Sequence, residues 1–549
     1  MRVREEVGNL SVQAIAGNHV VLLGMDIADS AKDGLLGFAI ERVDRETDRG
    51  RWLPNFLRFE VNQDAAGWSS TQDNPVQAFV WGDYAVEPGA ALLYRVTAMY
   101  GQPGALEPGD TVSVSVDVEH EHDGQHGIYF NRGVAGSQRY TELFTDASPL
   151  GNPAALEWLS RGLFEAFSAF IGEATGPGHS LRGAFYEFAY APALELLAEA
   201  ARRGVDVELA VAHPENTEDE WILSRSNEAA VNEAQLADVV AWRRSSKGIP
   251  HNKFLVRLED GEPTDVWTGS TNITDGGIFG QSNVGHAVRS ADVARAYLDY
   301  WKQLHADTET APLRVLVDQE NPVPEGEPPA NETSHMFSPR RGERALHWYA
   351  QRMRAAKESI FFTAPFGVSQ AFEKEVLLDP AIAVPRYVLL EKPDNNMEAL
   401  RADPHNQLVA GAYLGKGRWR QFLKESLTGL NERVRYIHTK YLLIDPLSDD
   451  PVVITGSANF SGGSVSTNDE NMLVIRGDKR VADIYLSEFM RLFTHMRFRA
   501  KTTTHDTDPT PSPAAQAEAT PFSLEQDERW TKPWFDPDNP KCKERLLFR

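Results

Sequence analysis

Two histidine–lysine pairs stand at matching distances from a glycine–serine turn in this chain. His251 and Lys253 precede the tetrapeptide Gly-Ser-Thr-Asn, and His438 and Lys440 precede Gly-Ser-Ala-Asn. In both copies the histidine comes 18 residues before the glycine. Chance rarely places five matched identities at the same offsets, so we interpret the two copies as an internal duplication that gives two homologous lobes.

An imidazole and an ammonium group in each copy are groups that can cleave a phosphodiester. One imidazole can attack phosphorus while the other protonates the leaving oxygen, and the roles then reverse. Lys253 and Lys440 would neutralise the phosphoryl oxygens, while the turns would donate hydrogen bonds and orient this shell. The turn residues predicted to bind substrate are Ser270, Asn272, Ser457 and Asn459. Because side chains supply the positive charge, the sequence predicts a reaction with no metal ion and no cofactor.

A structural role is the alternative for each pair taken alone. A buried strand can hold a satisfied histidine next to a lysine whose ammonium group reaches the surface. A single copy of the pattern would favour this interpretation. The second copy, at the same spacing, favours chemistry.

The segments around the motifs alternate between strands and helices. Residues 436–444 predict a buried strand on which His438 and Lys440 share one face. Residues 180–213 predict a strand, a helix and a strand before the first motif, and a short strand and a helix follow each turn. This order predicts an α/β fold of two lobes with mixed, largely parallel sheets, whose ligand lies at strand ends.

The two motifs resemble those of the phospholipase D superfamily. His-x-Lys followed by Gly-Ser-x-Asn occurs twice between about residues 180 and 496. Phospholipases D, phosphatidyltransferases, tyrosyl-DNA phosphodiesterases and some nucleases belong to this family. The resemblance implies two lobes related by a pseudo-twofold axis, with one active site shared between them. It also implies that His251 is the nucleophile, which forms a phosphohistidine, and that His438 is the general acid.

An acidic residue downstream of the motif usually fixes the histidine tautomer in this family. Glu470 lies 32 residues after His438, and Asn283 occupies the same place after His251. We therefore predict that Glu470 lies near His438 and favours its imidazolium form, whereas Asn283 leaves His251 neutral and nucleophilic. The two histidines would then occupy different electrostatic environments, as unequal roles require.

Asp445 closes the second motif and is a further catalytic candidate. Leu258 occupies the matching position of the first copy. An aspartate at the end of a strand is often structural, so its absence from the first copy does not argue against a shared site.

Composition divides the chain into five parts. Residues 1–125 contain short strand-like runs broken by Gly, Pro and Asp, with near-perfect alternation in TVSVSVDVE. This pattern predicts a β-sandwich similar to a fibronectin type III domain. The other predicted parts are a first lobe at 126–320, a Pro-rich linker at 321–340, a second lobe at 341–500, and a linker with an aromatic tail that packs back onto the body at 501–549.

Three histidines cluster where the sandwich is predicted to end. His120, His122 and His126 lie in the stretch EHEHDGQHG together with Asp123. The cluster could bind a transition metal. A solvated polar linker has the same composition, and we favour that interpretation.

Charge and cysteine content bound the setting of the protein. The 549 residues carry a formal charge of −24 and a single cysteine, Cys542. No intrachain disulfide can therefore form, and a reducing compartment fits. The sequence shows no secretory leader and no apolar run of membrane-spanning length. We predict a cytoplasmic protein that is competent as a monomer, since both half-sites lie in one chain.

The substrate class stays open at the level of the sequence. The negative charge disfavours diffuse binding to nucleic acid or to an anionic membrane. Two basic stretches with interleaved aromatic residues, 338–357 and 416–422, could contact lipid headgroups or single-stranded nucleic acid. For the first stretch we favour an ordinary solvated helix face.

Three classes of function follow from these patterns. A phospholipid-directed hydrolase or phosphatidyltransferase is favoured, because two motifs in one chain are the usual arrangement of the lipid enzymes, and it would make peripheral contact with a membrane. A nuclease or DNA-end phosphodiesterase is the alternative. A non-enzymatic scaffold is disfavoured, because both histidine–lysine pairs are intact. The N-terminal domain is a candidate binding site for a protein partner.

Overall fold

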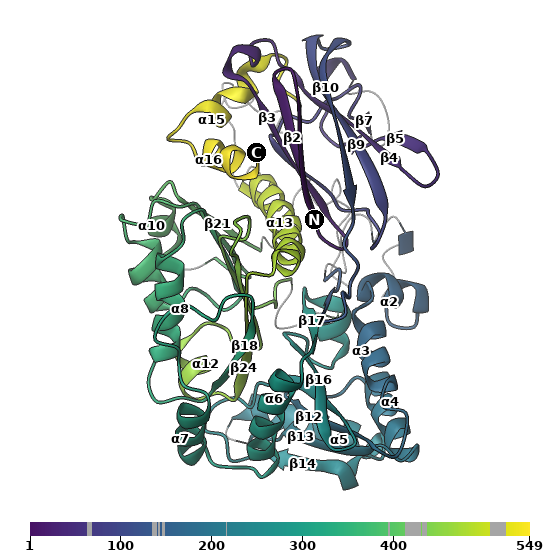
Figure 1. The fold of residues 1–549 in the computed structure, drawn as a ribbon, viewed down its shortest axis with the longest axis vertical. Helices are drawn as coiled ribbons and strands as arrows, with labels where there is room; N and C mark the ends of the chain where they lie inside the picture. The colour runs from purple at the N-terminus through teal and green to yellow at the C-terminus, as the bar shows by residue number, and fades with distance from the viewer. Residues whose placement is uncertain are drawn as a thin grey trace.

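The computed structural model contains an N-terminal β-sandwich, two α/β lobes and a C-terminal tail (Figure 1). It describes residues 1–62, 69–133, 140, 143–144, 149–215, 217–393, 396–411, 430, 436–504 and 523–549. The basic stretch at 416–422 and most of the linker after residue 504 lie outside these residues. Within the described part of the chain, no helix combines the length and apolar character needed to cross a bilayer.

Two four-stranded antiparallel sheets form the sandwich. Alternation explains how the last strand buries one face: Val112, Val114 and Val116 are buried, whereas the serines between them are exposed. The first sheet has the order β1 (Arg2–Val7), β2 (Leu10–Ala16), β3 (Val21–Ile27) and β8 (Val80–Asp83). The second has the order β10 (Ala105–Asp117), β9 (Ala91–Gln102), β4 (Gly37–Asp44) and β5 (Arg49–Trp52), and a small ribbon pairs β6 (Pro54–Asn55) with β7 (Ser69–Ser70).

The first lobe is a seven-stranded sheet covered by helices. Its strands, in sheet order, are β11 (His126–Phe130), β17 (Val284–Arg289), β16 (Glu262–Gly269), β15 (Lys253–Glu259), β12 (His179–Phe185), β13 (Asp206–Ala212) and β14 (Val240–Arg243). Its helices are α2 (Pro153–Ser160), α3 (Leu163–Gly172), α4 (Ala191–Arg202), α5 (Glu218–Glu233), α6 (Ala291–His305) and α7 (Thr310–Glu320).

The second lobe repeats this sheet strand for strand. Its order is β18 (Thr333–Ser338), β24 (Glu470–Arg476), β23 (Val452–Gly456), β22 (Tyr441–Ile444), β19 (Ile360–Ala364), β20 (Arg386–Leu390) and β21 (Asn406–Ala410). Its helices are α8 (Arg344–Arg354), α9 (Gln370–Phe372), α10 (Met397–Arg401), α12 (Gly462–Ser466) and α13 (Lys479–Thr504). Matching strands take matching places in the two sheets, as an internal duplication predicts. The α/β class with two lobes behind antiparallel N-terminal sheets is therefore confirmed.

The expected predominance of parallel strands is wrong. In the first lobe only β12–β13 and β13–β14 are parallel, and in the second only β19–β20 and β20–β21. The remaining neighbours in both sheets are antiparallel. In each lobe the motif strand turns directly into the next strand, which makes that pair antiparallel. The Asp260-Gly261 turn between β15 and β16, with both residues at positive φ, is a hairpin signal that was readable from the sequence.

The predicted linker at 321–340 contains a strand. β18 pairs with β24 at the edge of the second sheet, so the second lobe begins by Thr333. Only Met336, Phe337 and Ser338 of its six residues are buried. This polar edge strand, next to a Pro-rich stretch, has too little apolar alternation to be separated from a linker.

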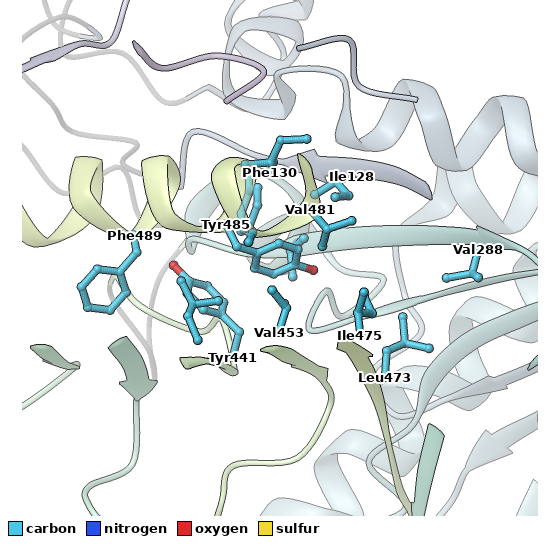
Figure 2. Close-up of a cluster of buried hydrophobic side chains, with 14 of the residues drawn as sticks. Ile128, Phe130, Val288, Tyr441, Val453, Leu473, Ile475, Val481, Tyr485 and Phe489 are labelled. Carbon is cyan, nitrogen blue, oxygen red and sulfur yellow. The ribbon is translucent and has the colours of Figure 1, made fainter. Parts of the chain in front are cut away.

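One hydrophobic cluster joins the two lobes (Figure 2) and also includes residues of the sandwich. Tyr485 of α13 makes edge-to-face contacts with Phe130 of the first lobe, at 5.1 Å between ring centroids, and with Tyr441 of the second, at 5.2 Å. Ile15 and Leu22 of the sandwich belong to the same cluster. Because packed cores deform little, this cluster fixes the position of one lobe against the other.

The aromatic tail packs into the sandwich. Trp530 stacks on Phe79 at 5.3 Å between centroids, and Trp534 is buried in the same core. The helices α15 (Lys532–Phe535) and α16 (Pro540–Phe548) follow, and Phe548 is fully buried. The last residues therefore complete the N-terminal domain.

Asp445 has a structural position at the end of β22, which corrects its assignment as a catalytic residue. Its carboxylate accepts hydrogen bonds from the backbone amides of Lys357, Glu358 and Ser359 at 2.7 to 3.1 Å. These residues lead into β19, so Asp445 joins two neighbouring strands. Its φ of 47° lies in the left-handed region, which aspartate tolerates better than most residues.

Replacing Asp445 should therefore affect stability and not chemistry. Asp445→Ala leaves three backbone donors without their acceptor and should lower the free energy of unfolding by roughly 1 to 3 kcal/mol. Asp445→Asn keeps an acceptor oxygen and the tolerance of positive φ, so it serves as the milder control. Denaturant unfolding measures both. A loss of turnover per folded molecule in Asp445→Asn would restore the catalytic assignment.

Candidate active site

The two motif histidines lie where the lobes meet, and each lobe holds the backbone of the other's histidine. The His251 amide donates to the Asp469 carbonyl at 2.9 Å, and the His438 amide donates to the Ser282 carbonyl at 3.1 Å. Parallel bridges between the lobes accompany both bonds. Arg243 of the first lobe adds a buried ion pair to Asp469 at 2.9 Å. The duplicated motifs thus meet in one place, with reciprocal contacts.

The side-chain partners of the histidines also cross between lobes, which corrects the predicted pairing. His251 Nδ1 lies 2.9 Å from Glu470 Oε2, and His438 Nδ1 lies 2.9 Å from Asn283 Oδ1. The sequence prediction had placed Glu470 beside His438 and Asn283 beside His251. Glu470 is the first residue of β24, and Asn283 directly precedes β17. Each of these strands follows the motif of its own lobe, and its start faces the opposite lobe. The number of residues between histidine and acid carries no information about which lobe the acid faces.

These contacts define the tautomers of both rings. The Glu470 carboxylate only accepts, so Nδ1 of His251 carries the donated proton. The Asn283 amide donates from Nδ2 to the Gly277 carbonyl at 2.8 Å and accepts from the Ser270 hydroxyl at 2.8 Å. Its Oδ1 therefore faces His438, whose Nδ1 donates. In both histidines Nε2 is the nitrogen left for the reaction.

The two lysines are buried in the same place. Lys253 Nζ donates to the His251 carbonyl at 2.7 Å, and Lys440 Nζ donates to the His438 carbonyl at 2.6 Å. Burial lowers the pKa of Lys253 to about 7 and that of Lys440 well below its usual value. Glu470 and Glu187 oppose both shifts. Two buried amines with lowered pKa values favour the binding of an anion, because the anion stabilises their charged ammonium form.

Burial also controls the histidines. It lowers the pKa of His251 to about 4, against the opposing effect of Glu470. Burial, Lys440 and Lys253 lower the pKa of His438 well below its usual value. Burial raises the pKa of Glu470, but His251 and Lys253 outweigh it and hold that pKa below its ordinary value. An entering phosphate anion would raise the pKa of both histidines, because it favours their charged form.

The turn residues divide into two kinds. The serines hold backbone: Ser270 Oγ accepts from the Val284 amide at 3.1 Å, and Ser457 Oγ accepts from the Asn471 amide at 3.0 Å. The amides of Asn272 and Asn459 each have a buried Oδ1 with no hydrogen-bond partner among the described residues. A buried polar atom of this kind is uncommon unless a ligand or water completes it.

Three residues near the site were not predicted from the sequence. Glu187 Oε2 accepts from Asn272 Nδ2 at 2.5 Å, so one of the two N–H groups of that amide is engaged within the first lobe. The Tyr186 ring lies 5.1 Å from the ring of His251. The Phe366 ring lies 6.3 Å from that of His438 and is 62% exposed. Tyr186 and Glu187 directly follow β12, and Phe366 lies two residues after β19. Both strands neighbour a motif strand, and a position just after such a strand was the signal available in the sequence.

The histidine cluster before the first lobe does not form a metal site. Within the part of the chain that the structure describes, no three His, Cys, Asp or Glu side chains are placed to hold a metal ion. His126 Nδ1 instead lies 2.9 Å from His286 Nε2 in the core, and His122 Nδ1 accepts from the Gly124 amide. His120 packs against Gly89.

Comparison with solved structures finds similar folds at low sequence identity. Polyphosphate kinase from Porphyromonas gingivalis is 11% identical with a TM-score of 0.38, and the match covers 57% of this chain and 43% of that chain. Phosphatidylserine synthase from Haemophilus influenzae is 11% identical with a TM-score of 0.41, covering 64% of this chain and 90% of that one. Yeast tyrosyl-DNA phosphodiesterase is 13% identical with a TM-score of 0.30, covering 57% and 88%.

Comparison with protein families gives a direct assignment. No curated protein sequence matches the chain. The family model described as "Cardiolipin synthase, PLD-like domain" matches residues 168–305 and 349–493. These two segments make up more than half of the 549 residues, and each contains one His-x-Lys pair and one Gly-Ser-x-Asn turn. The chain therefore belongs to the phospholipase D superfamily.

Proposed function

We propose that the protein cleaves a phosphodiester through a covalent phosphohistidine on His251. The reciprocal pairing of the two histidines with Glu470 and Asn283 carries this proposal. It presents two oriented imidazoles with different partners beside two buried lysines. Nucleophilic attack and proton donation need such unequal imidazoles.

The first step forms the covalent intermediate. His251 Nε2 attacks phosphorus, the bond from phosphorus to the leaving oxygen breaks, and His438 Nε2 gives that oxygen a proton. The attacking ring gains positive charge, which the Glu470 carboxylate stabilises across Nδ1. His438 faces a neutral amide, so no carboxylate holds its proton and it is the better acid. The family resemblance implies the same roles, although the pairing predicted from the sequence is the opposite one.

The second step releases the intermediate. His438, now neutral, takes a proton from water or from an acceptor alcohol, whose oxygen attacks phosphorus. The bond between phosphorus and His251 breaks, and the starting protonation states return. Lys253 and Lys440 balance the phosphoryl charge in both steps. This clamp needs no metal ion.

A phospholipid is the proposed substrate class. Phe366, at 62% exposed, and Ile249, at 37% exposed, place apolar surface next to the two histidines. Such a rim suits the glycerol and acyl portion of a lipid. Single-stranded nucleic acid is the second candidate, because an exposed aromatic ring near buried cations also suits a stacked base. Hydrolysis and phosphatidyl transfer differ only in the acceptor of the second step.

The covalent step can be tested by intact mass after quenching with an activated aryl phosphodiester. Wild-type protein should gain one phosphoryl adduct, and His251→Ala should gain none. His438→Ala should still gain it, because an activated leaving group needs no proton, but should release it slowly. An adduct on His438 that persists in His251→Ala would reverse the assignment. No adduct in any variant would indicate direct attack by water.

Substrate class can be tested by competition against a chromogenic diester in excess EDTA. Turnover should persist in EDTA because lysines supply the phosphate clamp. Phospholipid vesicles should inhibit it, and Phe366→Ala should weaken this inhibition more than it affects the chromogenic reaction. Stronger competition by single-stranded DNA than by vesicles would select the nucleic-acid alternative. Loss of turnover on chelation, restored by one divalent ion, would contradict the mechanism.

The role of Asn283 gives a prediction for pH dependence. Asn283→Asp places a carboxylate beside His438 Nδ1 and raises the pKa of that histidine. The limb of kcat/KM that falls as His438 loses its proton should then move to higher pH, by about one unit or more. Asn283→Gln, which keeps a neutral acceptor, is the control. Identical basic limbs in the aspartate and glutamine variants would show that His438 is not the acid.

A further inference from the structure

A pocket lies between the end of α7 and the start of α8, and neither of the two motif histidines lines it. Its volume is about 750 Å³. Arg340, Arg341 and Arg344 line it, together with the carboxylates Asp318 and Glu325. The three guanidinium groups come from the basic stretch that the sequence favoured as a solvated helix face. They outnumber the carboxylates, so the pocket carries excess positive charge.

Arg340 is unusual among these residues because it is buried. Arg340 is only 2% exposed, yet its Nε and Nη1 have no hydrogen-bond partner among the described residues. Nη2 donates to Asn321 Oδ1 at 2.5 Å, and Nη1 lies 3.8 Å from Asp318 Oδ1, beyond hydrogen-bond distance. A buried guanidinium whose Nε and Nη1 carry three unpaired N–H groups is costly unless a ligand meets them.

The surroundings of Arg340 add two further attractions for an anion. Arg344 is exposed and is the first residue of α8, an 11-residue helix. The N-cap residue Glu343 makes no side-chain cap, so the first amides of the helix are not satisfied from that position. The N-terminus of a helix attracts negative charge. Arg341 is 63% exposed in its side chain, and its 3.4 Å contact with Asp318 is a loose ion pair.

We propose that this pocket binds a small molecule through a phosphate group, at a site separate from the catalytic centre. Nε and Nη1 of Arg340 are covered, so binding turns its planar guanidinium toward the pocket, where its fork of donors matches two phosphate oxygens. Arg341 and Arg344 supply charge at the mouth. The phosphate can belong to a lipid-derived ester or to a nucleotide. Neither the motif histidines nor their lysines line the pocket.

The test uses full-length protein carrying Lys253→Ala and Lys440→Ala, which weakens phosphate binding at the catalytic centre. Equilibrium dialysis with inorganic phosphate should still find one bound equivalent. Adding Arg341→Ala and Arg344→Ala should weaken this binding roughly tenfold or more, since two charged donors are lost. Both arginines are exposed, so the fold should survive. Arg340→Lys, which keeps the charge but loses the fork, should also weaken binding.

Arg354→Ala is the matched control, because Arg354 ends the same helix and pairs with Asp379 outside the pocket. It should leave phosphate binding unchanged. The absence of binding in the lysine background, or an equal loss in Arg354→Ala, would overturn the proposal. Glycerol 3-phosphate and a nucleoside monophosphate form the remaining arms. The tighter ligand identifies the source of the phosphate, and equal affinities assign recognition to the phosphate group alone.

Discussion

Each motif imidazole is oriented by a hydrogen bond from Nδ1 to the opposite lobe, and the rest of the structure depends on this exchange. A buried ring nitrogen without an acceptor would be costly, and a ring without an orienting partner would not present Nε2 consistently. Because Glu470 serves His251 and Asn283 serves His438, neither lobe contains a complete half-site. The lobes must therefore be held to hydrogen-bonding precision. The shared core around Tyr485 provides that rigidity.

The charge balance of the site indicates what it is built to receive. Four basic groups are buried together, and Glu470 and Glu187 are the carboxylates that offset them in the pKa values of both lysines. Burial depresses the pKa of each basic group, so the charged forms of these groups are unfavourable until an anion stabilises them. In the proposed mechanism, the asymmetry between a carboxylate and an amide partner separates the two imidazoles into a nucleophile and an acid. Fold and chemistry are thus linked through one duplicated segment in which Asn283 and Glu470 occupy equivalent positions.

Local features of the sequence predicted the duplication and the alternating face of Val112, Val114 and Val116. These depend on side-chain periodicity or on repeated identities. The strand predicted at 436–444 is only partly correct, because β22 begins at Tyr441, after His438 and Lys440. The exchange of Glu470 and Asn283 between lobes could not be predicted, because distance along one chain does not say which lobe a strand end faces. Asp445 occupies a motif position but has a structural role. This role could not be predicted, because its hydrogen-bond partners at residues 357–359 lie far away in the sequence. The predominance of parallel strands was wrong for a different reason, because alternating strands and helices predict parallel pairs whereas the Asp260-Gly261 turn makes a hairpin.

The exchange of partners between lobes is the central claim, and nitrogen NMR of selectively labelled histidines tests it most directly. Spectra of wild-type protein and of Glu470→Gln, recorded against pH, follow the protonation of His251 and His438 separately. Loss of the carboxylate should lower the pKa of His251 and change its Nδ1 signal, because the ionised partner favours the charged ring. The His438 signals should change much less. The opposite result, with His438 responding and His251 unaffected, would contradict the account.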